Sequence, residues 1–503
     1  MEYAVAVFDV GMTNKKAAVY DDGLRQLDVS YKSFGPLKSC AGDREFDVHD
    51  LDGIKSFFLA ELKKFAAKYP VRAIAVTTHG ATFVCLDGEG KVCAPCVYYT
   101  YEPGEEFQRE FYAKAGDKDT LQVSTCTPPL SSMINPAKGI FFLQKYLSGD
   151  FAKTKTILNY PSYWGHVLTG VSGAEPTYLG CHSYLWDHAK AAYSDVAEKL
   201  GISALLPRNY KNSYETLGTV TPEIARLTGL SPDTVVTMGI HDSNASLLPY
   251  LVREKAGGFV LNSTGTWCVL MHPQDTLGYE PGDIGNIVFF NQSALRKPVK
   301  TAIFLGGFEL DSYVTLFKKI NDTDVFPPYC YDVFNAAHEE RDTYLLPEIV
   351  AGSGQFTKTK AGILEKGVFY PFAEITRDHH PAVLRQPERF WALLVTSLVI
   401  QTLTALDRAG RKNGDRIFTE GGFRQNRGYN ALLSYALPNN ETFLTNLNEA
   451  TSFGAAMTAV MALSGKNEVD PCLVNIEYLP CRAEEFPHFA AYQQKWLELA
   501  ARS

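Results

Sequence analysis

The stretch AVAVFDVGMTNKKAAVY (residues 4–20) decides how the rest of the chain is interpreted, because it joins two apolar runs through a short polar turn. Ala4 to Phe8 is an unbroken apolar run, typical of a buried strand, and it ends at Asp9. In the turn, Gly11 would let an anion approach the backbone amides, and Thr13 adds a hydroxyl donor. Asp9 could hold Mg²⁺ through water, since hard cations prefer oxygen ligands. A plain hairpin in which Asp9 caps the turn explains the same residues.

Two later stretches repeat this pattern of a strand followed by a turn rich in glycine. The stretch FVLNSTGTWCVLM (residues 259–271) places Thr264, Gly265 and Thr266 between two apolar runs. The stretch FTEGGFRQN (residues 418–426) ends a strand with two glycines, which would let a flat ligand such as a nucleotide lie against the backbone. With the first hairpin, these stretches indicate a weak internal duplication. The alternative is that any large α/β protein offers such turns, with the glycines serving only the loops.

A candidate catalytic carboxylate lies in the stretch GIHDSN (residues 239–244), between an expected strand and an expected helix. Active-site residues of α/β sheets usually follow the carboxyl ends of strands, so Asp242 could act as a general base. At the start of a helix, however, an aspartate is most often an N-cap. His241 could donate to a substrate oxygen or be a satisfied buried histidine.

The composition is that of a globular protein with layered strands and helices. The chain has 503 residues, of which 46% are hydrophobic and 21% charged. Short apolar strands alternate with longer helical stretches, which favours an α/β fold of about two to four domains. The formal net charge is −8 and there is no Lys/Arg-rich run. These features argue against nucleic acid or an anionic membrane as a partner.

Several features predict a cytoplasmic protein. The ten cysteines are sparse and irregularly spaced, and the pair Cys93 and Cys96 lacks the further ligands of a zinc site, so reduced thiols are expected. No basic region precedes the N-terminal apolar run, which argues against a signal peptide. The most apolar stretch, residues 391–406, contains several polar side chains and is expected to be a buried helix rather than a membrane span. Residues 489–501 are expected to form a terminal amphipathic helix.

The four motifs, in this order and spacing, resemble those of the FGGY carbohydrate kinases over roughly residues 3–465. A late segment from Glu449 to Ala456 is similar to a helix of that family. The resemblance implies an α/β fold of two actin-like (ribonuclease H-like) domains flanking a central active-site cleft, with ATP and Mg²⁺ as cofactors. Residues 1–250 would bind the sugar and carry the first phosphate hairpin and the catalytic aspartate. Residues 251–503 would bind ATP and include a C-terminal helical tail.

The resemblance also implies a role for each matching residue. Asp242 matches the catalytic base, and Asp9 would support Mg²⁺. The positions that match the sugar-contacting region are Thr78, His79, Gly80, Thr82, Tyr101 and His241. The positions that match the phosphate and adenosine motifs are Gly11, Thr13, Asn14, Lys15, Thr264, Gly265, Thr266, Gly421, Gly422 and Asn426.

The expected substrate is a neutral sugar, because the candidate sugar residues include no Arg or Lys. The pair His241 and Asp242 is similar to that of rhamnulokinases, Thr78 is closer to fuculokinases, and His79 resembles xylulokinases. We therefore expect ATP-dependent phosphorylation of a ketose or deoxyketohexose (L-rhamnulose or L-fuculose) at a primary hydroxyl, with D-xylulose or L-ribulose as the alternative. From another class, the chain could be a non-catalytic actin-like ATP-binding sugar sensor. A homodimer is left open.

The sequence departs from the family pattern at three places that together bear on the identity of the sugar. Residues 98–102 replace a stretch that usually contains an arginine, and residues 161–163 stand where many relatives carry an aspartate. Arg424 replaces a small residue in the Gly-Gly motif. None of these departures removes the phosphate turns.

Overall fold

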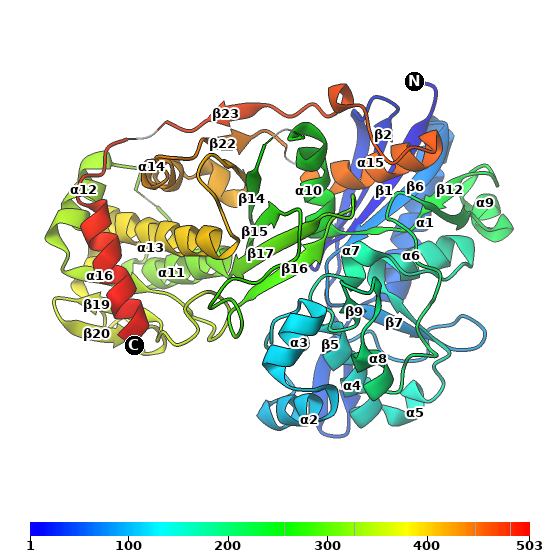
Figure 1. The fold of residues 1–503 in the computed structure, drawn as a ribbon, viewed down its shortest axis with the longest axis horizontal. Coiled ribbons are helices and arrows are strands. Elements are labelled where there is room, and N and C mark those ends of the chain that lie inside the picture. The colour runs from blue at the N-terminus through cyan, green and yellow to red at the C-terminus, as the bar shows by residue number, and fades with distance from the viewer. Residues whose placement is uncertain (256, 326, 448, 483, 503) are drawn as a thin grey trace.

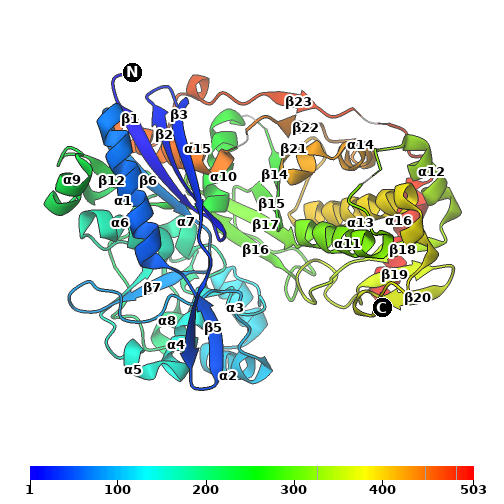
Figure 2. The same ribbon diagram turned by 180° about the vertical axis from the view of Figure 1, so that it is seen from behind.

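Two lobes, each built on a mixed seven-stranded sheet, make up the computed structural model of this chain (Figure 1). The structure describes residues 1–255, 257–325, 327–447, 449–482 and 484–502. The lobe that contains the N-terminus carries a smaller α/β subregion below its sheet, whereas the other lobe carries the C-terminus (Figure 2).

The first sheet is centred on the strand predicted from residues 4–10. Its order is β11-β12-β6-β1-β2-β3, and β13 pairs with β6 beyond β12. The strands are β1 (Ala4–Val10), β2 (Asn14–Asp21), β3 (Gln26–Ser33), β6 (Val71–Thr78), β11 (Thr216–Thr219), β12 (Val235–Thr237) and β13 (Ile240–His241). β1 pairs antiparallel with β2 and parallel with β6. Its residues Ala4 to Val7 are fully buried, as the unbroken apolar run predicted.

Helices cover both faces of this sheet. On one face lie α1 (Leu51–Lys68) and α6 (Tyr160–Thr169), and on the other lie α10 (Asp242–Arg253) and α15 (Ala450–Ser464). α15 comes from the far end of the chain yet packs on α10, β1 and β6, beside which it lies in both views. At the crossing, a Cβ on Gly454 would lie 1.8 Å from the carbonyl oxygen of Ala245. Glycine is therefore required for α10 and α15 to approach this closely.

The second sheet has the order β16-β17-β15-β14-β21-β22-β23. Its strands are β14 (Phe259–Thr264), β15 (Cys268–Pro273), β16 (Val288–Gln292), β17 (Pro298–Phe304), β21 (Arg416–Gly421), β22 (Thr442–Thr445) and β23 (Tyr478–Pro480). The hairpin β14–β15 repeats the hairpin β1–β2. In the first lobe β1 pairs parallel with β6, and in the second lobe β14 pairs parallel with β21. Both β6 and β21 end in a further sequence motif. The weak duplication inferred from the sequence therefore corresponds to repeated topology.

Helix α13 (Pro387–Arg408) is the core helix of the second lobe and packs with α11 (Gly306–Asn321), α12 (Tyr331–Glu340) and α14 (Arg427–Ala436). By length and composition it could cross a membrane, but 83% of its most apolar window is buried inside the protein. The predicted buried helix over residues 391–406 is thereby confirmed. The terminal helix is also confirmed as α16 (Phe489–Arg502), which docks on β18 (Thr343–Leu346) through Trp496 and Tyr492.

The remaining elements complete the two lobes. In the first lobe they are β4 (Leu37–Ala41), β5 (Arg44–Val48), β7 (Phe83–Leu86), α2 (Glu105–Ala115), α3 (Lys118–Thr125), α4 (Pro136–Tyr146), α5 (Ser148–Phe151), β8 (Thr156–Asn159), α7 (Pro176–Leu179), β9 (Trp186–Asp187), β10 (Ala192–Tyr193), α8 (Asp195–Lys199) and α9 (Pro222–Thr228). In the second lobe they are β19 (Gly362–Glu365), β20 (Val368–Pro371) and the 3₁₀ turns η1 (Phe372–Glu374), η2 (Ala382–Arg385) and η3 (Gly422–Gln425). A fourth 3₁₀ turn, η4 (Pro471–Leu473), follows α15.

Candidate active site

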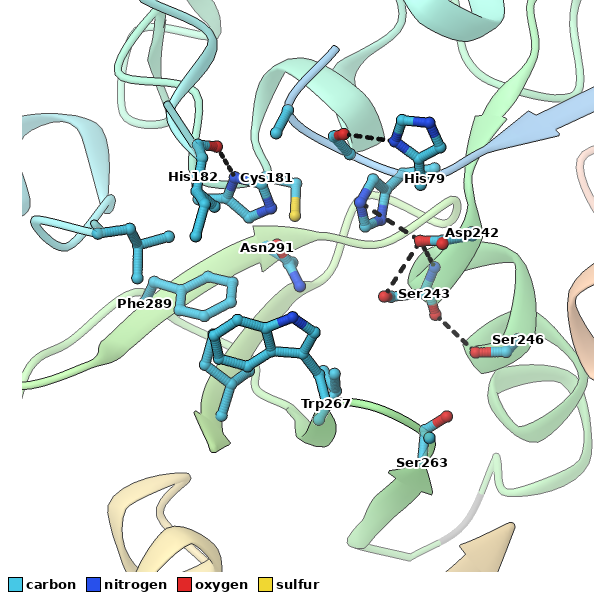
Figure 3. Close-up of a pocket in the computed structure, with 18 of the residues that line it drawn as sticks. His79, Cys181, His182, Asp242, Ser243, Ser246, Ser263, Trp267, Phe289 and Asn291 are labelled. Carbon is cyan, nitrogen blue, oxygen red and sulfur yellow. Dashed lines mark hydrogen bonds and ion pairs between the residues drawn. The ribbon is translucent and has the colours of Figure 1, made fainter. Parts of the chain in front are cut away.

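A cavity of about 300 Å³ lies where the two lobes meet, and both contribute to its wall. Figure 3 shows Asp242 and Ser243 on one side, Trp267 and Ser263 of the second hairpin opposite them, and Cys181 and His182 beyond. The lining residues are His79, Gly80, Ala81, Tyr99, Leu130, Ile134, Cys181, His182, His241, Asp242, Ser243, Ser246, Ser263, Thr264, Gly265, Trp267, Val269, Phe289, Asn291, Ile303 and Thr451. We call this space the inner cavity.

Asp242 is the first residue of α10, and its carboxylate faces the inner cavity. Its Oδ1 accepts a hydrogen bond from the Ser243 backbone amide at 2.6 Å and another from the Ser243 hydroxyl at 3.3 Å. His241, not Asp242, is the N-cap residue, so the alternative interpretation of Asp242 as the cap is wrong. Burial raises the pKa of the Asp242 carboxyl to about 6, although the two Ser243 bonds oppose this rise. The carboxylate is therefore ionised but basic near neutral pH.

The imidazoles of His79 and His241 line the inner cavity together with this carboxylate. His241 Nε2 lies 3.4 Å from Asp242 Oδ1, and His79 follows the end of β6. Burial lowers the pKa of His79 and of His241 to about 3. Both rings are uncharged at neutral pH, and no Lys or Arg is found among the described residues that line the inner cavity. Hydroxyl groups suit such a wall better than a second anion does.

A second cavity of about 520 Å³ adjoins the first, and the two share Thr264 and Gly265. Its lining residues are Thr264, Gly265, Thr266, Gly307, Leu310, Asp311, Pro327, Tyr329, Trp391, Gly422, Phe423, Gln425, Asn426 and Arg427. Tyr329 and Trp391 offer aromatic surface to a flat ring. Asn426 caps α14, since its Oδ1 accepts from the Tyr429 amide at 3.0 Å. We call this space the outer cavity.

The second and third glycine motifs are joined directly. The Thr264 hydroxyl donates to the Glu420 carbonyl and accepts from the Phe423 amide at 3.0 Å. Gly421 has φ +78°, and a Cβ there would lie 1.9 Å from the Thr264 carbonyl oxygen. The side chain of Thr264 thus holds the two turns together, whereas Gly265 and Thr266 are exposed: Gly265 lines both cavities and Thr266 the outer one.

The first hairpin exposes Thr13 and Asn14, with Gly11 beside them. Lys15 behaves differently from its neighbours in the turn: its Nζ donates to the Gly11 carbonyl at 2.8 Å and to the Met12 carbonyl at 2.7 Å. Burial lowers its pKa to about 8. The Lys15 side chain therefore stabilises the turn from beneath, and the turn presents backbone amides rather than this ammonium group.

Asp9 lies at the end of β1 and is bound on one oxygen. Its Oδ2 lies 3.1 Å from Lys16 Nζ and accepts from the Ser452 hydroxyl at 3.2 Å, while Lys16 also pairs with Glu449 of the α15 N-terminus. Within the described part of the chain, these Asp9 contacts use Oδ2, so Oδ1 suits a water molecule of hydrated Mg²⁺. Since Mg²⁺ loses its water reluctantly, binding of the ion through water fits this site.

Three of the predicted sugar residues do not line the inner cavity. Thr78 donates to the His79 carbonyl at 2.9 Å, and Thr82 lies behind His79. Tyr101 packs edge-on against Phe46 and Phe142 in a hydrophobic cluster of the first lobe. By contrast, His79, Gly80 and His241 do line the cavity, and Tyr99 takes the place expected for Tyr101.

Asn291 and Trp267 are two of the lining residues that were not predicted from the sequence. Asn291 in β16 is buried, and its Oδ1 has no hydrogen-bond partner among the described residues although it belongs to the cavity wall. No motif surrounds Asn291, so the sequence held no signal for it. Trp267 directly follows the predicted Ser263–Thr266 turn, and an aromatic residue beside a ligand turn could have been singled out.

Comparison with known proteins covers most of the chain. Residues 4–249 match "FGGY family of carbohydrate kinases, N-terminal domain", and residues 256–468 match "Carbohydrate kinase FGGY, C-terminal domain". A rhamnulokinase from Halalkalibacterium halodurans is 25% identical over 273 residues, which is 54% of this chain and 56% of the relative. An L-fuculokinase from Salmonella typhi is 23% identical over 276 residues, 53% of this chain and 56% of the relative. The alignments thus span about half the length of these relatives.

The similarity in three dimensions extends over the whole chain. A crystal structure of a carbohydrate kinase from Novosphingobium aromaticivorans matches 100% of this chain and 99% of its own, with a TM-score of 0.78 and 25% identity. This likeness confirms the predicted fold class of two actin-like domains flanking a cleft. The domain limits at residue 250 and the individual site roles stay predictions.

Proposed function

The chain belongs to the FGGY family of carbohydrate kinases, and on this basis we propose that it transfers the γ-phosphoryl group of ATP to a hydroxyl group of a neutral sugar. The observation that supports this most strongly is that the two cavities share the lining residues Thr264 and Gly265, with Asp242 on the inner side. A nucleotide in the outer cavity would direct its phosphates toward this junction. A sugar in the inner cavity would present a hydroxyl there from the opposite side.

Asp242 accepts the proton of the attacking hydroxyl in this proposal. Phosphoryl transfer depends on alignment and charge neutralisation more than on covalent chemistry, so the exposed turn amides and the base supply most of what the protein must provide. Two hydrogen bonds from Ser243 fix the orientation of the carboxylate, and burial keeps it basic enough to take a proton. Mg²⁺, held through water near Asp9, would neutralise charge on the phosphates.

An apolar wall of the inner cavity favours a deoxy sugar. Leu130, Phe289 and Ile303 belong to one buried cluster, against which Ile134, Trp267 and Val269 pack. A methyl group against this wall gains about 0.8 kcal/mol from burial, whereas a hydroxyl without a partner there costs about 1–3 kcal/mol. We therefore propose a 6-deoxyketohexose, L-rhamnulose or L-fuculose, phosphorylated at its primary hydroxyl. The named activities of the two curated relatives agree with this choice.

Two alternatives make different use of the same site. D-xylulose or L-ribulose would occupy the polar part of the cavity but leave the apolar wall without a methyl group to bury. A sensor that only binds sugar and ATP has no need of a base, yet Asp242 lies in the cavity wall with a raised pKa.

A coupled assay for ADP release over matched sugar pairs tests the proposal. L-rhamnulose is compared with L-fructose, and L-fuculose with L-tagatose, because each pair differs only by the hydroxyl at carbon 6. The deoxy member should have the higher kcat/KM by roughly tenfold to a hundredfold. Faster turnover of the parent ketohexose would contradict the role of the apolar wall. Sugar binding without ADP release on any sugar would favour the sensor.

A further inference from the structure

Three side chains to which the proposed phosphoryl transfer assigns no chemical step meet in the wall of the inner cavity. Cys181 and His182 follow α7, and His241 precedes α10. One ligand atom from each of these residues lies within 4.8 Å of the others. Figure 3 shows Cys181 and His182 on the far side of the cavity from Trp267.

The hydrogen bond of His182 leaves its cavity-facing nitrogen free to bind a metal. Its Nδ1 lies 3.0 Å from the Ile134 carbonyl, which can only accept, so Nδ1 carries the proton. A partner of this kind is the usual support for a histidine that ligates through its other nitrogen. The His182 backbone has φ +41°, an uncommon conformation that directs the ring into the cavity wall.

Gly80 opens the space between the two imidazoles. A Cβ on this residue would lie 2.7 Å from His241 Nε2 and 3.1 Å from His182 Nε2. Both ring nitrogens therefore face the same bare stretch of backbone. The His241 nitrogen that faces this stretch, Nε2, has Asp242 Oδ1 as a polar neighbour at 3.4 Å, a contact that a bound metal would replace.

We propose that Cys181, His182 and His241 bind Zn²⁺ and that the bound ion blocks the sugar site. One thiolate and two imidazoles suit Zn²⁺, whereas Mg²⁺ prefers oxygen ligands. Tetrahedral Zn²⁺ needs donor separations of about 3.3–3.6 Å, so the three side chains must close by about 1 Å. The Zn–S bond forms as the Cys181 S–H bond breaks, and the proton passes to water.

Zinc in this position would oppose the proposed kinase reaction in two ways. It would occupy the cavity assigned to the sugar, and it would lie close to Asp242, whose Oδ1 is 3.4 Å from His241 Nε2. Asp242 or a water molecule would complete the four ligands. The binding of Zn²⁺ stands on its own geometry, while inhibition rests on the proposed function.

Equilibrium dialysis of the full chain against Zn²⁺ tests the site without any turnover. Two variants remove ligands: Cys181→Ser removes the thiolate, and His182→Asn removes an imidazole while tolerating the left-handed backbone. Cys96→Ser is the matched control, because Cys96 is also buried but lies outside the inner cavity, and serine can keep its bond to the Phe83 carbonyl. The exposed Cys40 and Cys472 contribute the same background in every protein.

The parent chain and Cys96→Ser should share a Zn²⁺ site that is weakened by about tenfold or more in both ligand variants. L-rhamnulose at saturation should displace this Zn²⁺ from the parent chain. Unchanged affinity in Cys181→Ser would overturn the proposal, and His182→Asn decides in the same way if the serine variant does not fold. A chain that phosphorylates no sugar but loses Zn²⁺ in both variants would refute the kinase and leave the zinc site standing.

Discussion

Replacing Asp242 with asparagine separates a catalytic base from a structural residue. The amide can still accept the Ser243 backbone bond through its oxygen, and His241 remains the N-cap, so the start of α10 should persist. What the variant loses is the ability to take a proton. General-base catalysis contributes roughly 10²–10⁴ in rate, so kcat should fall by that factor, or about 2.7–5.5 kcal/mol.

The stability of this variant should move in the opposite direction from its activity. Burial raises the Asp242 pKa from the ordinary 3.8 to about 6, so the folded state holds the proton more tightly than the unfolded state. This contribution to stability is complete in acid and is lost as the pH rises through about 6. The difference corresponds to about 3 kcal/mol, which we reduce to about 1–2 kcal/mol because 34% of the side chain is exposed. Asp242→Asn should therefore be as stable as the parent at pH 8, or more so.

Two measurements decide the role of Asp242. Steady-state kinetics on the preferred sugar give kcat and KM, and urea unfolding at pH 8 gives the free energy of unfolding. Ser243→Ala is the control, because it removes the weaker 3.3 Å bond to the carboxylate and leaves the base in place. A stable Asp242→Asn variant with near-parental kcat would refute the assignment. If the variant were less stable than the parent, the argument from burial would be wrong.

Three further predictions follow from the same geometry. The kcat/KM for the sugar at saturating ATP should fall tenfold per pH unit below about pH 6 in the parent, since the Asp242 pKa is about 6 and that of His241 about 3. This acidic decline in kcat/KM should vanish in Asp242→Asn. A decline that survives in the variant would belong to another group. Excess EDTA should abolish turnover, and added Mg²⁺ should restore it, whereas undiminished activity would exclude a metal near Asp9. Gly421→Ala should cost more than about 2 kcal/mol of stability, because Gly421 has φ +78° and its Cβ would lie 1.9 Å from the Thr264 carbonyl oxygen. Gly422→Ala, whose Cβ would meet nothing closer than 3.9 Å, should fold normally and raise the KM for ATP. Equal stabilities of the two variants would contradict the tight joining of these turns.

The parts of the site that could be predicted from sequence are those set by local chemistry. An unbroken apolar run specifies β1, and turns with glycine and hydroxyl groups specify both hairpins. Asp242 was placed between a strand and a helix by the same local signals. The burial of α13 also follows from its composition, which no exposed helix would carry.

The parts of the site that could not be predicted depend on the direction in which a side chain points or on contacts between residues far apart in the sequence. Successive side chains of an extended segment point to opposite faces, so an error of one position turns a lining residue into a packed one. Lys15 reads as a cation in a phosphate turn, yet its ammonium group satisfies two carbonyls of that turn. Asn291 reaches the inner cavity only because β16 of the second lobe lies against the first. The packing of α15 on the first sheet joins residues more than 400 positions apart, such as Lys16 and Glu449.

The most direct test of the central claim is ³¹P NMR of the full chain incubated with ATP, Mg²⁺ and L-rhamnulose. We expect ADP and a sugar phosphomonoester in equal amounts, with the new phosphorus signal split by the two protons of a primary carbon. The signal should depend on the presence of the sugar. Inorganic phosphate in place of the ester, or a phosphorus coupled to a single proton of a secondary carbon, would contradict the account.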